Sequence, residues 1–233
     1  MLNWLTNRHP GPELMDAPDV SHDLFKGVLK ELAVINTLLG GYTPTIAGIK
    51  KVAGSNIQNL TIVDMGCGGG DTLVRLAEYA QKKGYNWKLI GIDLHPAAVE
   101  YAKDWCKHHA NIQIIQGNMF DLPTLVPECD IVINALFMHH LTNEEAKASI
   151  KLMQYARIGW VVNDLHRHFL AYYSIWGLTS VLSKSPLVKY DARISVWRGW
   201  KKTDWQQLQM ETQSEFEISW HWAFRWVITC KAK

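Results

Sequence analysis

A glycine-rich turn is the first stretch of this sequence whose residue types and spacing indicate chemistry. The run Asp64-Met65-Gly66-Cys67-Gly68-Gly69-Gly70 follows a short apolar segment and precedes a helical pattern that starts at Asp71. Glycines at positions 66, 68 and 70 leave the backbone without Cβ atoms, so the chain can turn sharply and a ligand can approach it closely. A strand, a glycine turn and a helix in this order are typical of α/β proteins that bind nucleotide-like ligands.

The residue types and glycine spacing of this turn favour one kind of ligand. The spacing is Gly-x-Gly-x-Gly, whereas dinucleotide-binding turns prefer Gly-x-Gly-x-x-Gly. An acid, Asp64, also stands two residues before the first glycine. A carboxylate suits a positively charged ligand and fits poorly beside a pyrophosphate. The turn therefore favours S-adenosylmethionine (SAM), which carries a sulfonium and an ammonium group and no phosphate, although a plain loop can also be rich in glycine.

Two histidine-containing segments are candidates for proton transfer. His139 lies in Met138-His139-His140-Leu141, directly after an apolar run, and His166 lies in Asn163-Asp164-Leu165-His166-Arg167-His168. A histidine titrates near neutral pH and can take the proton that a hydroxyl acceptor must lose. Either segment can instead simply begin a helix, so His139 and His166 are candidates for catalysis.

The elements that would position these residues alternate along the chain. Apolar runs with strand patterns occupy residues 60–64, 88–93, 112–116, 130–136, 160–165, 215–222 and 225–231, and helical patterns separate most of them. Such alternation predicts a Rossmann-like α/β fold, with a mostly parallel seven-stranded sheet, helices on both faces and an antiparallel terminal hairpin. A long apolar helix is expected over residues 166–183, and a capping box at Thr142 and Glu145 begins another helix.

The first 55 residues stand apart from this alternation. Residues 1–55 contain a Pro/Gly-rich stretch and a helical pattern over 21–39, before the first strand. We expect this part to be a helical extension, either a lid over the ligand or a cover for the sheet edge. Residues 56–233 are expected to form the ligand-binding domain.

Four segments in order resemble the class I SAM-dependent methyltransferases. They are Val63-Asp64-Met65-Gly66-Cys67-Gly68-Gly69-Gly70, Gly91-Ile92-Asp93-Leu94, Gly117-Asn118-Met119-Phe120-Asp121-Leu122-Pro123, and Asp130-Ile131-Val132-Ile133-Asn134-Ala135-Leu136. The last segment leads into the His139 motif, which is similar to the Leu-His-Asp-Trp-Ser-Asp-Glu segment of phenolic O-methyltransferases. A His-His-Leu sequence at this place is also similar to ubiquinone- and menaquinone-type methyltransferases. The resemblance covers residues 58–165 well and the rest weakly.

The resemblance implies a role for each matched residue. Gly66, Gly68 and Gly70 form the cofactor turn, and Asp93 accepts both ribose hydroxyls. Asn118 replaces the Asp that is common in the family and bonds the adenine edge. Leu94 and Met119 would pack on the two faces of the adenine ring. The methionine portion of SAM would lie beside Asp64 and Asn134. His139 takes the position of the base, and His166 or its neighbour Asp164 orients the acceptor.

Bulk composition excludes several classes of protein. The net charge of the 233-residue chain is +2 and no long basic run is present, so nucleic acid is not an expected partner. The four cysteines form no C-x-x-C pair, and we expect reduced thiols and no metal site. The N-terminus lacks a signal peptide and no segment is long enough to span a membrane, which predicts a cytoplasmic monomer or homodimer.

The expected reaction is methyl transfer from SAM to a small aromatic acceptor, phenolic or quinone-like, in a biosynthetic pathway. Eleven tryptophans, most of them after the fourth strand, suggest a flat or greasy acceptor pocket, or else a Trp-rich core. No Asn/Asp-Pro-Pro-aromatic sequence is present, which argues against methylation of exocyclic amines. O-methylation is favoured, and the alternatives are C-methylation of the quinone type, a non-catalytic SAM-binding protein and a dinucleotide oxidoreductase.

Overall fold

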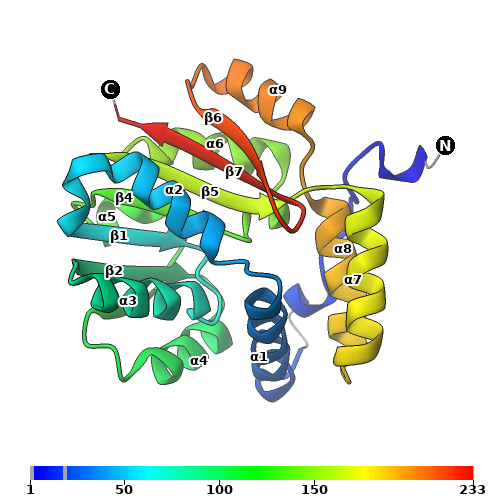
Figure 1. Cartoon of the computed structure of the whole chain (residues 1–233). Helices are drawn as coiled ribbons and strands as arrows, with labels where there is room; N and C mark the ends of the chain where they lie inside the picture. The colour runs from blue at the N-terminus through cyan, green and yellow to red at the C-terminus, as the bar shows by residue number, and fades with distance from the viewer. Residues whose placement is uncertain (1–2, 18–19, 233) are drawn as a thin grey trace.

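The computed structural model describes residues 3–17 and 20–232. A seven-stranded sheet with the order β3-β2-β1-β4-β5-β7-β6 forms its centre (Figure 1). The strands are β1 (Asn59–Met65), β2 (Asn86–Asp93), β3 (Ile112–Gln116), β4 (Ile131–Ala135), β5 (Gly159–Leu165), β6 (Glu217–His221) and β7 (Arg225–Lys231). The first five strands are parallel, and β7 is antiparallel to both β5 and β6. The predicted Rossmann-like sheet with an antiparallel terminal hairpin is therefore confirmed.

Helices cover both faces of this sheet. Those of the alternating part are α3 (Asp71–Lys83), α4 (Pro96–Cys106), α5 (Leu122–Leu125), α6 (Asn143–Met153) and α9 (Lys202–Thr212). Local signals explain their ends. Gly84 ends α3 in a left-handed conformation, and Thr142 and Glu145 form the predicted capping box of α6.

Two apolar cores lie on opposite faces of the sheet. One contains Val63, Val132 and Trp160, and the other contains Ile62, Ile133 and Val161. Consecutive residues of one strand thus enter different cores, as expected for strands that are buried on both faces. Because the central strands are fixed from both sides, their carboxyl ends form a rigid edge on which a site can be built.

Four further helices lie before and after the alternating part. They are α1 (His22–Leu38), α2 (Thr43–Ala53), α7 (Phe169–Leu182) and α8 (Pro186–Arg198). The predicted helix over 21–39 corresponds to α1, which Ser21 caps, whereas α2 and α8 were not predicted from the sequence. The long helix expected over 166–183 begins later, at Phe169, because His166 forms a β-bridge with Trp200 and His168 caps the helix.

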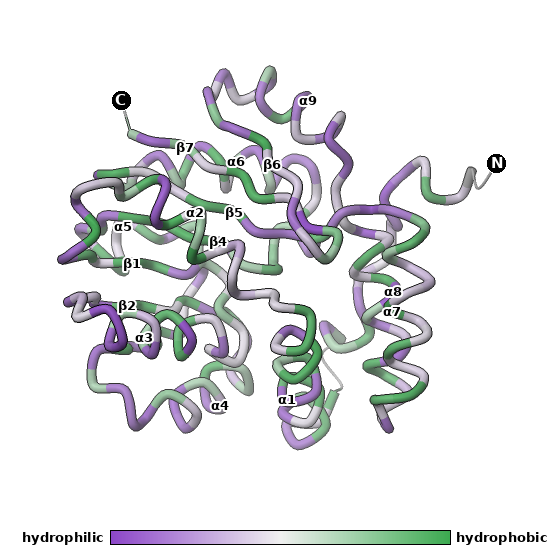
Figure 2. Tube along the Cα trace, viewed as in Figure 1, coloured by the Kyte–Doolittle hydropathy of each residue, from purple (hydrophilic) through white to green (hydrophobic). Residues whose placement is uncertain are grey.

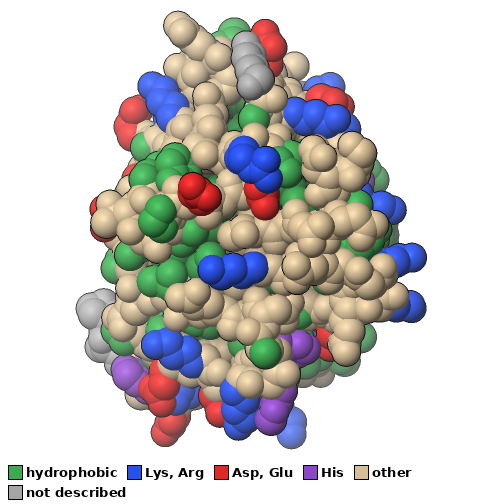
Figure 3. All heavy atoms as spheres, turned by 90° about the vertical axis from the view of Figure 1, so that its left-hand side faces the viewer, with side chains coloured by type: hydrophobic (Ala, Val, Ile, Leu, Met, Phe, Trp, Pro, Cys, Tyr) green, Lys and Arg blue, Asp and Glu red, His purple; other side chains and the backbone are tan. Residues whose placement is uncertain are grey.

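Helices α1, α7 and α8 lie together beyond the carboxyl ends of the parallel strands (Figure 1). A third apolar core joins α1 to α4 and α8 through Phe25, Val28, Ala98 and Val188. Hydrophobic residues recur along α1 and α7 (Figure 2). The opposite face of the molecule, at the amino ends of the strands, carries interspersed Lys, Arg, Asp and Glu side chains (Figure 3). Many of the exposed large apolar side chains of the described residues lie on α1 and α7.

Candidate active site

A cavity of about 940 Å³ lies at the carboxyl ends of the parallel strands. Its walls come from parts of the chain that are far apart in sequence: residues 13–16, α1, the glycine turn, the ends of β2 and β4, α7, α8 and the β6–β7 turn. Ligands of open α/β sheets bind at this edge. The size is in the upper part of the range of small-molecule sites, which is roughly 300–1,000 Å³.

The glycine turn forms one wall of the cavity. Gly66, Gly68 and Gly70 all have positive φ, between 51° and 76°, which other residues rarely adopt. The amides of Gly66 and Cys67 donate to the carbonyl of Ile92, at 2.9 and 3.1 Å, which fixes the turn against β2. A Cβ atom at Gly66 would overlap the ring of Phe137. The predicted turn is thus closely packed against Phe137, which itself lines the cavity.

The end of β2 places an acid at the rim of this wall. The carboxylate of Asp93 accepts hydrogen bonds from the amides of Gly68 (2.8 Å) and His95 (2.9 Å). Burial raises the pKa of Asp93, while these two hydrogen bonds act in the opposite direction. The structure thus couples the acid to the glycine turn through a direct bond.

Six of the nine residues expected to hold the cofactor line the cavity: Gly66, Gly68, Asp93, Leu94, Asn118 and Met119. Leu94 is 66% exposed and Met119 is 7% exposed, so one of these apolar side chains faces solvent and the other is buried. The side-chain oxygen of Asn118 accepts from the amide of Phe120, which leaves its NH₂ group as a donor for a ligand. The roles assigned to these residues stay predictions.

The remaining three residues, Asp64, Asn134 and Gly70, lie behind the wall rather than in the cavity lining. Asn134 donates to the carbonyl of Met65 at 2.9 Å, and both Asp64 and Asn134 are fully buried or nearly so. Burial raises the pKa of Asp64 well above its usual range. In the described part of the chain, one oxygen of each side chain lacks a hydrogen-bond partner. Their predicted contact with the methionine portion is untested, and this geometry favours an effect through the turn.

Asp71, which sequence reasoning used only as the start of a helix, also faces the cavity. It accepts a hydrogen bond from the hydroxyl of Tyr42 at 2.7 Å. Burial raises the pKa of Tyr42 well above its usual range, and the neighbouring Asp71 carboxylate acts in the same direction. A carboxylate here adds negative charge at the wall where a cationic ligand is expected.

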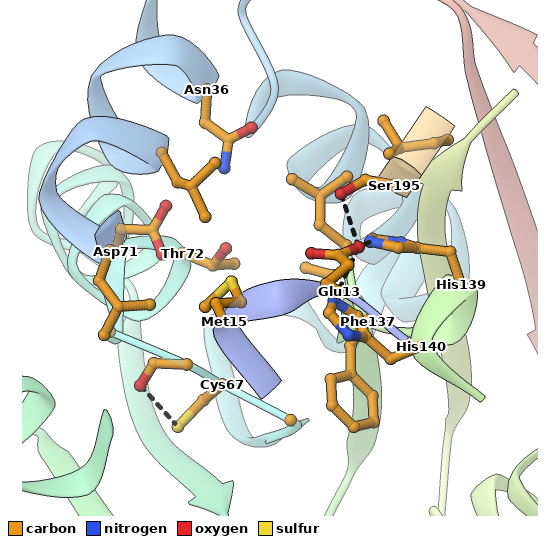
Figure 4. Close-up of a pocket in the computed structure, with 18 of the residues that line it drawn as sticks. Glu13, Met15, Asn36, Cys67, Asp71, Thr72, Phe137, His139, His140 and Ser195 are labelled. Atoms are coloured by element: carbon orange, nitrogen blue, oxygen red, sulfur yellow. Dashed lines mark hydrogen bonds and ion pairs between the residues drawn. The ribbon is translucent and has the colours of Figure 1, made fainter. Parts of the chain in front are cut away.

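A second group of polar residues stands in the cavity across from the glycine turn (Figure 4). We call Glu13, Asp16, His139, His140 and Asp164 the acid–histidine cluster. His139 donates from Nδ1 to Asp164 Oδ1 at 2.6 Å, and its Nε2 lies 3.4 Å from Glu13 Oε1. His140 Nδ1 contacts Asp16 Oδ2 at 3.1 Å, and its Nε2 lies 3.7 Å from the same oxygen of Glu13. The sequence identified His139 but not Glu13, because Glu13 reaches the cavity from the N-terminal segment.

Burial and charge oppose each other within the cluster. Burial lowers the pKa of His139, but Asp164 and Glu13 outweigh this effect and raise it to about 9. Burial raises the pKa of Glu13, but His140 and His139 lower it to about 2. The cluster therefore holds ionised carboxylates around an imidazole with a high affinity for protons.

Two arginines fix the turn that carries both histidines. Arg8 and Arg198 donate to the carbonyl of His139 at 2.8 and 2.9 Å, and Arg198 also donates to the carbonyl of His140 at 2.7 Å. The amide of His139 donates to Asp164 at 2.7 Å. These hydrogen bonds hold the turn in one conformation, and such preorganisation is typical of a functional site.

The second catalytic candidate occupies a different environment. His166 is absent from the cavity lining, and its Nδ1 accepts a hydrogen bond from the indole of Trp220 at 3.2 Å. Burial lowers the pKa of His166 to about 4, and the neighbouring His168 and Arg167 act in the same direction. The structure does not bring His166 together with His139, and its catalytic role stays a prediction.

The tryptophans are divided between the core and the surface: five are buried, whereas Trp105, Trp176, Trp220 and Trp222 are exposed. Trp160, Trp200, Trp205 and Trp226 are buried in the core cluster on one face of the sheet. Among the tryptophans in the described residues, Trp222 lines the cavity. The pocket walls are instead aliphatic and phenylalanine side chains, and the alternative of a Trp-rich core describes these residues better.

Within residues 3–17 and 20–232 no single helix has the length and apolar character to cross a bilayer, although the bent pair formed by residues 22–38 and 43–58 meets these criteria jointly.

Comparisons with known proteins agree with this architecture. Residues 62–156 match a family model described as a methyltransferase domain. An indolepyruvate C-methyltransferase from Streptomyces griseus is 32% identical over 93 residues, which are 38% of this chain and 27% of the relative. The chain matches less than half the length of the curated relatives it resembles.

Solved structures share the fold. A SAM-dependent methyltransferase from Aquifex aeolicus is similar with a TM-score of 0.62 and 14% identity, over 89% of this chain and 98% of the other. An O-methyltransferase family 2 protein from Planctomyces limnophilus, in complex with apigenin, has a TM-score of 0.64 and 13% identity, over 93% of this chain and 63% of the other. Residues 62–156 therefore match a methyltransferase domain, and the chain shares the fold of these SAM-dependent methyltransferases.

Proposed function

We propose that this chain transfers a methyl group from SAM to a small, mainly apolar acceptor with an ionisable hydroxyl, phenolic or enolic. One observation carries the proposal: a single cavity joins the glycine turn and Asp93 on one side to the acid–histidine cluster and an apolar chamber on the other. A donor and an acceptor in one enclosed space satisfy the main demand of methyl transfer, which is alignment without water.

The donor side suits SAM. When bound, SAM supplies the methyl group on a sulfonium; Asp93 would accept the ribose hydroxyls, and Leu94 and Met119 would flank the adenine. Asp71 adds a carboxylate near the turn for the cationic portion. A carboxylate beside the glycine turn, such as Asp71, fits poorly with a pyrophosphate, which disfavours a dinucleotide.

The acceptor side of the cavity is apolar, and its walls come from the helices α1, α7 and α8. Its lining side chains from α1, α7 and α8 are Phe25, Leu29, Leu32, Ile175, Leu178, Ala192 and Val196. These residues exclude water and offer few hydrogen bonds, so they favour a hydrophobic acceptor body. The acid–histidine cluster is the main polar feature near this chamber.

We propose that the whole acid–histidine cluster, rather than His139 alone, takes up the proton that the acceptor loses. Glu13 lies next to Nε2 of His139, so an acceptor oxygen at this place would meet both groups. Because the pKa of His139 is about 9, only its deprotonated fraction can accept the proton, and turnover is expected to rise with pH up to about 9. A phenol and an enolisable carbon acid both need such a proton acceptor. The relation to an indolepyruvate C-methyltransferase therefore keeps C-methylation as the second candidate, while the apigenin complex of a structural neighbour supports O-methylation.

The test has two stages. Titration calorimetry with SAM, S-adenosylhomocysteine (SAH) and NAD is expected to detect the first two and not NAD. Methyl-labelled SAM is then incubated with matched panels of phenols and 2-oxo acids, and the position of the label in each product is read by NMR. SAM binding without turnover on either panel would favour a non-catalytic SAM-binding protein, and NAD binding would refute the cofactor assignment.

A further inference from the structure

We propose that Glu13, His139 and His140 form a binding site for one divalent transition-metal ion of the Zn²⁺ type. Residue spacing does not indicate this site, since the cysteines lack metal-binding spacing and Glu13 is distant from the histidines in the sequence. In the fold, one ligand atom from each residue lies within 4.8 Å of the others. Two imidazoles and one carboxylate are a frequent ligand set for zinc with an open position.

The distances fit a shared cation better than direct hydrogen bonds. Good hydrogen bonds between nitrogen and oxygen are about 2.7–3.2 Å long. The Nε2 atoms of His139 and His140 instead lie 3.4 and 3.7 Å from Glu13 Oε1. Metal–ligand bonds of about 2.0–2.1 Å at tetrahedral angles separate neighbouring ligand atoms by about 3.3 Å. The two distances to Glu13 are thus close to those between ligands of one ion, and the ligand atoms of the two histidines lie within 4.8 Å of each other.

The other ring nitrogens provide an independent argument. Nδ1 of His139 is held by Asp164 at 2.6 Å, and Nδ1 of His140 is held by Asp16 at 3.1 Å. Metal-binding histidines almost always donate their second ring nitrogen to a carboxylate or carbonyl, which fixes the tautomer and points the free nitrogen at the metal. Both histidines have this arrangement, and both Nε2 atoms converge on Glu13.

Burial and support complete the site. Glu13 is 3% exposed, and its Oε1 also accepts a hydrogen bond from Ser195 at 2.6 Å. All three ligand residues line the cavity, so the fourth position faces the acceptor chamber. An acceptor oxygen can complete the coordination there; this last role rests on the proposed function, whereas cation binding itself does not.

The test measures binding without cofactor or acceptor. Chelator-treated full-length protein is titrated with Zn²⁺ in competition with a chromophoric chelator, and separately with Co²⁺, whose visible absorption reports four-coordinate geometry. One ion per chain is expected. Glu13→Gln and His140→Ala are each expected to weaken Zn²⁺ binding by about 100-fold or more, and Asp16→Asn by about 10- to 100-fold.

His108 and His109 supply the matched control. They are an adjacent pair outside the cavity lining, and the double variant His108→Ala/His109→Ala is expected to bind Zn²⁺ normally. Circular dichroism and SAH affinity verify that each variant is folded. Zn²⁺ binding unchanged in both Glu13→Gln and His140→Ala, or lost in the control, overturns the site. Because neither readout requires turnover, failure of the proposed reaction leaves this result interpretable.

Discussion

Several residues at the cavity are each held in place by more than one hydrogen bond. Asp93 bonds the glycine turn through one oxygen and the start of α4 through the other. His139 is contacted at its ring and its amide by Asp164 and at its carbonyl by Arg198. Residues restrained in this way make clear tests, because their removal changes a defined interaction.

Asp93→Ala tests the cofactor assignment. The substitution leaves two ribose hydroxyls without their acceptor, so we expect the affinity for SAH to fall about ten- to a hundredfold in titration calorimetry. Asp121→Ala, at an exposed acid one turn after Asn118, is the control and is expected to bind normally. Equal affinities of the two variants would remove Asp93 from the site.

His139→Asn tests the acceptor side. The Asn side-chain NH₂ can still donate to Asp164, as Nδ1 does, but nothing replaces Nε2 beside Glu13. We expect the turnover number to fall about 10²- to 10⁴-fold, while the SAH affinity changes little. Rates and calorimetry are compared with those of His108→Asn. Near-normal turnover on a weakly acidic phenol contradicts a role for His139 in proton transfer.

Elements show which sequence signals are local and which are not. The glycine turn and the capping box of α6 each depend on a few neighbouring residues, and both were predicted. Helix α8 was missed because it buries residues around most of its circumference, among them Asp191 and Arg198, so no single apolar stripe marks it. The contact of Glu13 with His139 joins opposite parts of the chain, and no local pattern in the sequence indicates it.

The N-terminal segment is expected to close over bound ligands. Residues of α1 line the cavity, and the amides of Leu14 and Met15 donate to Asp191 on α8, so ligand contacts and lid contacts involve the same segment. Hydrogen exchange of α1 is expected to slow when SAH is added, whereas α9, which contributes no lining residue, stays unchanged. Equal exchange of α1 with and without SAH would make it a fixed cover of the sheet edge.

The terminal hairpin gives a prediction for the dependence of stability on pH. The folded-state pKa of His166, about 4, lies below its unfolded value of 6.5, so the unfolded chain binds a proton first. Its contribution is fully present above pH 6.5 and is lost as the pH falls towards 4. His166→Asn can still accept from Trp220, and we expect its thermal midpoint to fall less than that of the wild type between pH 7.5 and 4.5. Calorimetric scans of both, with His108→Asn as control, check this.

At the scale of the whole molecule, the sheet provides the donor half of the site and the added helices provide the acceptor half. The strands and the glycine turn could be predicted because hydrophobic periodicity and turn chemistry depend on residues that are neighbours in the sequence. The acceptor chamber could not, since α1, α7 and α8 meet only in the folded state. Cofactor binding and acceptor choice should therefore respond to different substitutions.

Ala192→Phe separates these two halves. Ala192 on α8 is 6% exposed and lines the chamber, so a phenyl ring there fills space that the acceptor would use. We expect the KM for bulky acceptors to rise at least about tenfold, with a smaller effect on compact ones and unchanged affinity for SAH. Overpacking costs about 1–3 kcal/mol, so the thermal midpoint is measured alongside. Lys184→Phe adds the same ring at an exposed position before the same helix and is expected to change neither parameter. If Ala192→Phe weakens SAH binding as much as acceptor binding, the chamber is part of the donor site and the acceptor enters elsewhere.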